Sequence, residues 1–285
     1  MCELFCLSSR NPTVASFSLR AFAQRGRNGI GPVDGWGLAF CDERDVRIYK
    51  EPEPAGDSEW LSFIQARRVP SRLVISHIRH ATHGGICLAN TQPFTRELGG
   101  RIHVFAHNGN LELNKLHKIS KGQRFISIGD TDSEAAFCIL LDRLSSLWLH
   151  EEVPTLASRL AVIEAFAAEM RELGPANFLY SDGDALFAHG HRRTQVSGQI
   201  EPPGLWWLQR QCACDRDALL ASGVSLDHSP APQKIVLLAS VKLTDEPWKP
   251  LQEGEVMAIR NGDIVATAAS STMTTGSLHD GAFAL

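Results

Sequence analysis

The chain has 285 residues, 44% of them apolar, which is enough for a large buried core in one or two domains. Its formal net charge is −4 with both signs interspersed, so it lacks the basic stripe of a nucleic-acid-binding protein. The first residues do not form a basic, apolar signal peptide, and no apolar run is long enough to cross a membrane. The seven cysteines are irregularly spaced, which favours reduced thiols, and we expect a cytoplasmic protein.

Short apolar segments rich in β-branched and aromatic residues predict eleven strands along the chain. They cover residues 2–7, 36–40, 46–49, 73–79, 102–107, 176–180, 185–188, 205–208, 234–239, 256–259 and 264–266. Helical spacing of apolar residues predicts four helices. They cover residues 14–23, 60–66, 132–148 and 156–173. Thr131 is expected to cap the third helix, and Gly174-Pro175 to end the fourth.

The order of these elements is strands, two central helices and then strands again. It predicts two antiparallel sheets packed together and covered by helices. We find no linker that divides the chain, and we expect a single domain over residues 1–268. Residues 269–285 are small, polar and without pattern, which favours a loose tail.

Cys2 directly follows the initiator methionine and becomes the N-terminal residue if that methionine is removed. One residue then carries both a thiol and a free α-amine. The amine titrates near ~8 and the thiol near ~8.5, so part of the amine is unprotonated at neutral pH and can take the thiol's proton. Cys2 is therefore a candidate nucleophile with a built-in base.

Polar motifs end or interrupt the predicted strands at four places. They are Gln24-Arg25-Gly26 with Asp34-Gly35-Trp36-Gly37, then His77-Ile78-Arg79-His80-Ala81-Thr82-His83-Gly84, then His107-Asn108-Gly109-Asn110, and finally Asp130-Thr131-Asp132-Ser133-Glu134. Together with Cys2, in this order and spacing, they resemble the glutaminase domain of class II glutamine amidotransferases, which are N-terminal nucleophile hydrolases. The resemblance covers residues 2–265 and is nearest to compact, stand-alone members. It implies an α+β fold, a four-layer αββα sandwich of two antiparallel sheets.

The resemblance implies an oxyanion hole formed by the Asn108 amide and the Gly109 N–H. The alternative is an ordinary hairpin turn, since Asn-Gly is a common turn pair. Arg79 is expected to bind the α-carboxylate of glutamine, because a guanidinium pairs with a carboxylate through two hydrogen bonds; the alternative is a structural salt bridge. Asp132 is expected to accept a hydrogen bond from the α-ammonium of glutamine. The alternative is a carboxylate at the start of a helix, where its negative charge interacts favourably with the helix dipole, and the two can hold together.

Three further residues correspond to positions near the family's pocket. Arg25 resembles an arginine that supports the terminal nucleophile, and a surface arginine is the alternative. Thr82 and His83 fall where the family's loop lines the glutamine pocket. A metal cluster of His77, His80 and His83 is a rival interpretation, but no zinc-binding spacing is present. We therefore expect neither a metal nor another cofactor.

The implied reaction is release of ammonia from the side-chain amide of glutamine through a thioester on Cys2. Only a short tail follows Ala266, so we expect either a separate synthase subunit that accepts the ammonia or a simple hydrolase. A γ-glutamyl amide or peptide amidase of the same fold is the first alternative. A non-catalytic glutamine-binding protein is the second, although a binder has no need of a terminal thiol.

Overall fold

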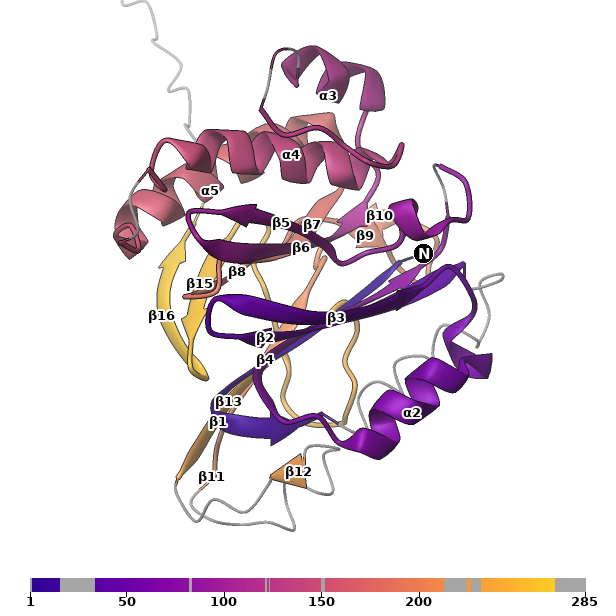
Figure 1. The fold of residues 1–285 in the computed structure, drawn as a ribbon, viewed down its shortest axis with the longest axis vertical. Coiled ribbons are helices and arrows are strands. Elements are labelled where there is room, and N and C mark those ends of the chain that lie inside the picture. Colours follow the sequence, from indigo (N-terminus) through magenta and orange to yellow (C-terminus); the bar gives the residue numbers. More distant parts are fainter. Residues whose placement is uncertain are drawn as a thin grey trace, which may run out of the picture.

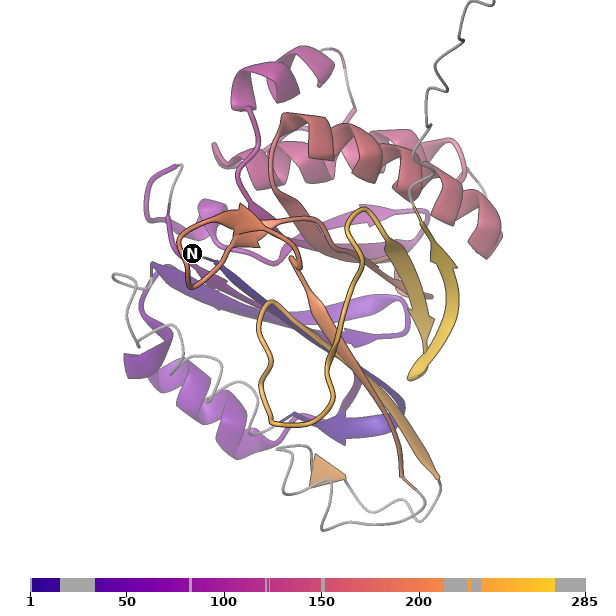
Figure 2. The same ribbon diagram turned by 180° about the vertical axis from the view of Figure 1, so that it is seen from behind.

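The computed structural model describes residues 2–15, 34–81, 84–120, 122, 124–149, 152–212, 225–226 and 232–269. Two antiparallel sheets lie face to face, with helices on the outer side of each (Figures 1 and 2). This is the α+β arrangement of two antiparallel sheets and covering helices that the sequence predicts.

The first sheet contains the N-terminal strand at its centre. Its spatial order is β14 (Lys249–Pro250), β11 (Trp206–Cys212), β13 (Gln233–Ala239), β1 (Glu3–Val14), β4 (Ser71–Arg79), β2 (Gly35–Asp42) and β3 (Asp45–Glu51), with β12 (Ser225–Leu226) paired to the end of β1. The second sheet has the order β16 (Asp263–Ala268), β15 (Val256–Arg260), β8 (Leu186–His189), β7 (Ala176–Ser181), β6 (Arg101–Gly109) and β5 (Phe94–Leu98). A separate pair joins β9 (Arg193–Thr194) to β10 (Ile200–Glu201).

Four α-helices are described, and they lie on the two outer faces (Figures 1 and 2). α4 (Asp132–Ser145) and α5 (Leu156–Leu173) cover the second sheet, α3 (Leu113–Ile119) packs beside α4, and α2 (Glu59–Arg67) covers the first sheet. Two short 3₁₀ turns, η1 (Ala55–Asp57) and η2 (Leu88–Asn90), lie in connections. Within the described part of the chain no helix is long and apolar enough to cross a membrane.

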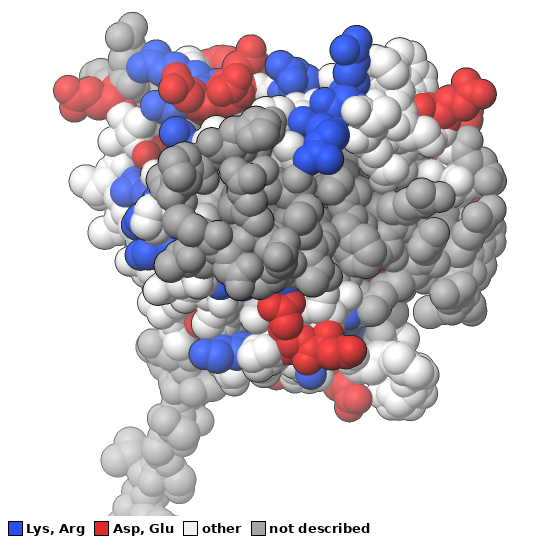
Figure 3. Space-filling view, turned by 90° about the horizontal axis from the view of Figure 1, so that it is seen from below, with Lys and Arg blue, Asp and Glu red and all other residues white. Residues whose placement is uncertain are grey.

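Side-chain alternation along the strands builds three apolar layers. Leu4 and Cys6 of β1 and Val104 and Ala106 of β6 are fully buried between the two sheets. Phe5, which points the other way, contributes to the cluster under α2. On the face of Figure 3, acidic and basic side chains are interspersed among the described residues.

The two long helices begin as the sequence predicts. The Thr131 hydroxyl accepts a hydrogen bond from the Glu134 N–H at 3.2 Å, and Thr155 caps α5 in the same way. The reciprocal half of a capping box is absent, because the Glu134 carboxylate accepts the N–H groups of Ile128 and Gly129 instead. α5 ends at Leu173, and its C-cap residue Gly174 has a φ of 147°, a value that favours glycine.

One expectation about local structure is wrong, and some of the observed elements were not predicted. Val14 is the last residue of β1, which continues past Pro12, and not the start of a helix; residues 16–23 of that predicted helix lie outside the described residues. β5 and α3 have no predicted counterpart. Both are short and rest on contacts with β6 and α4, so local sequence carries little signal for them. The predicted tail, apart from Ala269, also lies outside the described part, and the domain limits stay a prediction.

Candidate active site

Four of the predicted site residues line one small pocket at the end of the sandwich where β1 begins. Cys2 precedes β1, Arg79 is the last residue of β4, Gly109 is the last residue of β6, and Asp132 is the first residue of α4. The complete lining is Cys2, Arg79, His80, Ala81, Gln92, His107, Gly109, Thr131, Asp132 and Ser133. Segments more than 100 residues apart in the chain therefore meet at one thiol.

The Cys2 thiol lies against the backbone of His80. Its Sγ is 3.3 Å from the His80 N–H nitrogen, which donates to it, and 3.3 Å from the His80 carbonyl oxygen. Burial raises the pKa of the Cys2 thiol, and the His80 N–H and the nearby positive charges counteract this only in part. At neutral pH the buried thiol is therefore mostly protonated, and it needs a base to become a nucleophile.

Asn108 and Gly109 belong to β6 and not to a turn. They pair with Asn177 and Ala176 of β7, so the hairpin-turn alternative for this Asn-Gly pair is wrong. The Asn108 side-chain nitrogen donates to the Cys2 carbonyl oxygen at 2.6 Å. A Cβ at position 109 would lie 1.9 Å from the Pro175 carbonyl oxygen, so only glycine allows this close approach of the two strands.

Arg79 and Asp132 present opposite charges on the pocket lining. Arg79 is 3% exposed, and its Nη2 donates to the Gly84 carbonyl at 3.1 Å. The two carboxylate oxygens of Asp132 accept the backbone N–H groups of Leu111 and Ser133, both at 2.8 Å. Asp132 therefore lies at a helix start and in the pocket at once, a position compatible with both interpretations of this residue, although the N-cap itself is Thr131.

The remaining predicted residues lie outside the described part of the chain. Arg25 falls in the segment 16–33, and Thr82 and His83 fall between Ala81 and Gly84. Their predicted contributions to the pocket stay predictions.

Two residues at the site received no role from the sequence, Gln92 in the pocket lining and Ser240 beside it. The Gln92 side-chain oxygen accepts a hydrogen bond from the His107 N–H at 2.6 Å. It thereby pairs with the backbone of β6 just beyond the residues that β5 pairs. The Gln92 backbone lies directly over Gly37, where a Cβ would be 2.1 Å from the Gln92 carbonyl oxygen. Neither residue belongs to the four motifs named above, and Ser240, whose hydroxyl accepts a hydrogen bond from the Asn108 amide at 3.1 Å, is distant in sequence from all of them.

The histidines of β4 and β6 are buried and dispersed. Burial lowers the pKa of His77 to about 3 and that of His103 to about 4, so both are neutral at pH 7. His77 lies on β4, and the His103 Nδ1 is hydrogen-bonded to the Tyr180 hydroxyl at 2.6 Å. Within the described residues, no three His, Cys, Asp or Glu side chains are arranged to hold a metal ion.

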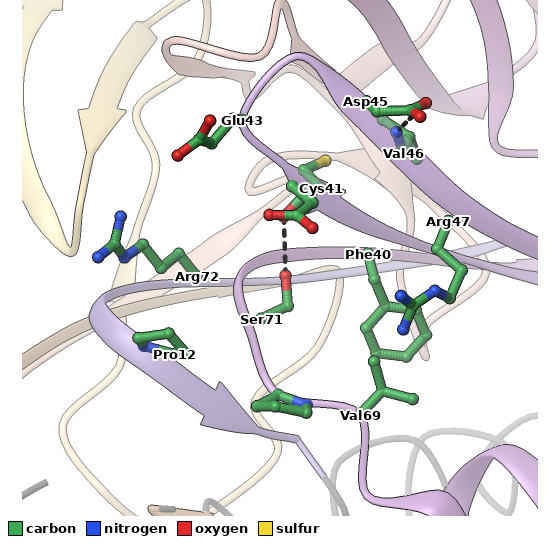
Figure 4. Close-up of a pocket in the computed structure, with 12 residues that line it drawn as sticks. Pro12, Phe40, Cys41, Glu43, Asp45, Val46, Arg47, Val69, Ser71 and Arg72 are labelled. Carbon is green, nitrogen blue, oxygen red and sulfur yellow. Dashed lines mark hydrogen bonds between the residues drawn. The ribbon is translucent and has the colours of Figure 1, made fainter.

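A larger cavity, of about 600 Å³, lies at the other end of the first sheet (Figure 4). In Figure 4, Arg72 and Glu43 lie on one side of it and Arg47 beside Phe40 on the other. Arg72 and Arg79 are seven residues apart on β4, which corresponds to about 20 Å at the rise of a strand. This cavity contains none of the residues around Cys2, so the smaller pocket is the better candidate for the chemistry.

Two facing antiparallel sheets, with a cysteine just before the central strand of the first, agree with the fold expected of the class II glutamine amidotransferases. The sequence matches the family model of the class II glutamine amidotransferases over residues 1–280. The chain belongs to this family.

Similar proteins agree with this assignment. YafJ of Escherichia coli strain K12, assigned by name to the glutamine amidotransferases, is 35% identical over 261 residues, which cover 90% of this chain and 96% of YafJ. A crystal structure of a Pseudomonas aeruginosa PA01 protein with the same assignment superposes with a TM-score of 0.66 at 31% identity, covering 93% of this chain and all of that one. The phosphoribosylpyrophosphate amidotransferase of Bacillus subtilis, at 15% identity and a TM-score of 0.60, shares the fold; the match covers 95% of this chain and 50% of that one.

Proposed function

We propose that the protein hydrolyses the side-chain amide of glutamine through a thioester on Cys2 and releases ammonia. The observation that carries the proposal is the single pocket lined by a thiol, a buried arginine, a helix-start carboxylate and the N–H-bearing end of β6. Such a pocket offers one group for each part of an amino-acid substrate that has a reactive amide.

The pocket residues suit the head group of glutamine. Arg79 binds the α-carboxylate through two charge-assisted hydrogen bonds, and Asp132 accepts the α-ammonium. Because the Asp132 carboxylate accepts hydrogen bonds from two backbone N–H groups, its direction is fixed when the substrate arrives. Arg25, Thr82 and His83 complete the pocket in this proposal.

The reaction starts when removal of Met1 frees the α-amine of Cys2. The amine takes the thiol proton, and the sulfur forms a bond to the amide carbon of glutamine. The Asn108 amide and the Gly109 N–H stabilise the negative oxygen of the tetrahedral intermediate, a contribution of ~10²–10³ in rate for each donor. The C–N bond then breaks as the proton passes to the leaving ammonia.

Water completes the cycle. It adds to the thioester carbon, the C–S bond breaks, and the thiol regains its proton while glutamate leaves. The raised pKa of the buried Cys2 thiol supports the need for the terminal amine, because the thiol alone would remain protonated. We further propose that the reaction takes place in the cytosol; Cys2, Cys6, Cys41, Cys87 and Cys138 are free thiols. The ammonia acceptor would be a separate synthase subunit.

The substrate is tested by comparing free glutamine with a panel of γ-glutamyl amides and peptides. We expect ammonia release from glutamine with a higher kcat/KM than hydrolysis of any substituted amide. A preference of tenfold or more for a substituted amide would replace the glutaminase assignment by a γ-glutamyl amidase. Because both substrates share the glutamyl head, the roles of Arg79 and Asp132 would be the same in either case. Absence of hydrolysis of every substrate, with tight binding of glutamine, would indicate a binding protein.

A further inference from the structure

The fully buried Ser240 lies between the N-terminal strand and Asn108. Its hydroxyl oxygen accepts a hydrogen bond from the Leu4 N–H at 2.9 Å and another from the Asn108 side-chain nitrogen at 3.1 Å. The Ser240 N–H in turn donates to the Leu4 carbonyl at 3.0 Å. Ser240 directly follows β13, which pairs with β1, so its hydroxyl is held in place by the sheet.

A buried ion pair adds to the rigidity of this region. Arg193 donates to the Glu3 carboxylate at 2.8 Å and also to the Ser240 carbonyl oxygen. Burial raises the pKa of Glu3, and its contacts with Arg193 and Ser240 oppose that change. The Glu3 carboxylate is therefore a natural acceptor for the hydroxyl proton of Ser240, which leaves the oxygen lone pairs for the Leu4 and Asn108 donors.

The direction of the Asn108 amide matters for catalysis. An asparagine side chain can turn so that its nitrogen and oxygen exchange places, which replaces two donors by an acceptor. In Asn108 one N–H is bound to Ser240, and the other points to the Cys2 carbonyl at 2.6 Å. The side-chain nitrogen of Asn108, and not its oxygen, therefore faces Cys2, as an oxyanion hole requires.

We propose that Ser240 is a positioning residue that keeps the donor end of the Asn108 amide directed at Cys2. The inference rests on the proposed function, in which the N–H now on the Cys2 carbonyl passes to the tetrahedral oxygen. Without the Ser240 hydroxyl the amide can turn, and its oxygen then lies beside the developing negative charge. The substrate head group contacts other residues, so its binding does not depend on Ser240.

The test is steady-state kinetics of glutamine hydrolysis, normalised by titration of active sites. Ser240→Ala should lower kcat about 10- to 100-fold, a fraction of the effect of losing an oxyanion donor, with KM within about twofold. In an Asn108→Ala background the same substitution should lower kcat no further, because in the proposal Ser240 affects kcat only through the Asn108 amide. Ser240→Thr keeps the oxygen and should recover most of the rate.

Gln233→Ala provides the matched control. The Gln233 side chain accepts a hydrogen bond from the Asn11 N–H and donates one to the Thr13 hydroxyl, at the far end of β1. Its loss therefore weakens the same strand without changing a contact of Asn108. It should lower the melting temperature and leave kcat unchanged.

Three results would overturn the inference. They are an unchanged kcat in Ser240→Ala, an equal loss in the Asn108→Ala background, or an equal loss of kcat in Gln233→Ala. If Ser240→Thr does not fold, the comparison in the Asn108→Ala background still decides. A wild-type protein with no hydrolase activity would instead reject the proposed function.

Discussion

Replacement of Cys2 by alanine is expected to abolish glutamine hydrolysis while glutamine still binds. In the proposed mechanism the sulfur forms the only covalent bond to the substrate. Burial lowers the pKa of His107 in the pocket lining, which makes this imidazole a weaker base for activating a water molecule in place of the thiol. Loss of a covalent nucleophile reduces turnover by roughly 10³-fold or more. The measurements are ammonia release and calorimetric titration with glutamine.

Cys87→Ala is the control for this prediction, since Cys87 is an exposed free thiol that does not line the pocket. It should retain wild-type kcat. Measurable turnover in Cys2→Ala, above about 1% of wild type, would show that another group attacks the amide. Loss of glutamine binding together with turnover would mean that the substitution disturbs the pocket itself.

Arg79→Lys is expected to weaken glutamine binding by about 10- to 100-fold. Lysine retains the positive charge but cannot form two parallel hydrogen bonds to a carboxylate, and a hydrogen bond to a charged group is worth about 1.5–3 kcal/mol. The measurement is glutamine affinity in the Cys2→Ala background, where no turnover interferes.

Arg143→Lys is the control for the arginine prediction. Arg143 pairs with Glu169 between α4 and α5 and lies outside the pocket lining, so its substitution should not change the affinity. An Arg79→Lys variant with wild-type affinity would remove Arg79 from the carboxylate site and leave it a structural role at the end of β4.

The class of fold and the local structure at Arg79 and Asp132 could be predicted from sequence because strong local signals accompany them. The apolar strand that ends at Arg79 and the capped helix that begins at Asp132 both have clear periodicity and end signals. Their convergence on Cys2 could be expected only through the resemblance, since spacing along the chain does not specify which strand ends meet in space.

The parts that sequence could not predict depend on contacts between distant segments. Asn108-Gly109 has the composition of a turn, yet tertiary pairing with β7 keeps it in a strand. Val14 starts a segment with helical spacing, but the ladder of β1 extends to it. Ser240 is a polar residue after an apolar strand, which is common and carries no signal of its own. Its hydrogen bond with Asn108, 132 residues earlier in the chain, exists only because the fold brings the two residues together.

Mass spectrometry of the purified protein after treatment with a glutamine-mimicking electrophile tests the central claim most directly. The account predicts a chain that lacks Met1 and carries one adduct, located on the N-terminal cysteine, with free glutamine slowing its formation. A chain that retains Met1 and hydrolyses glutamine at the full rate, or an adduct on another residue of an active protein, would contradict it.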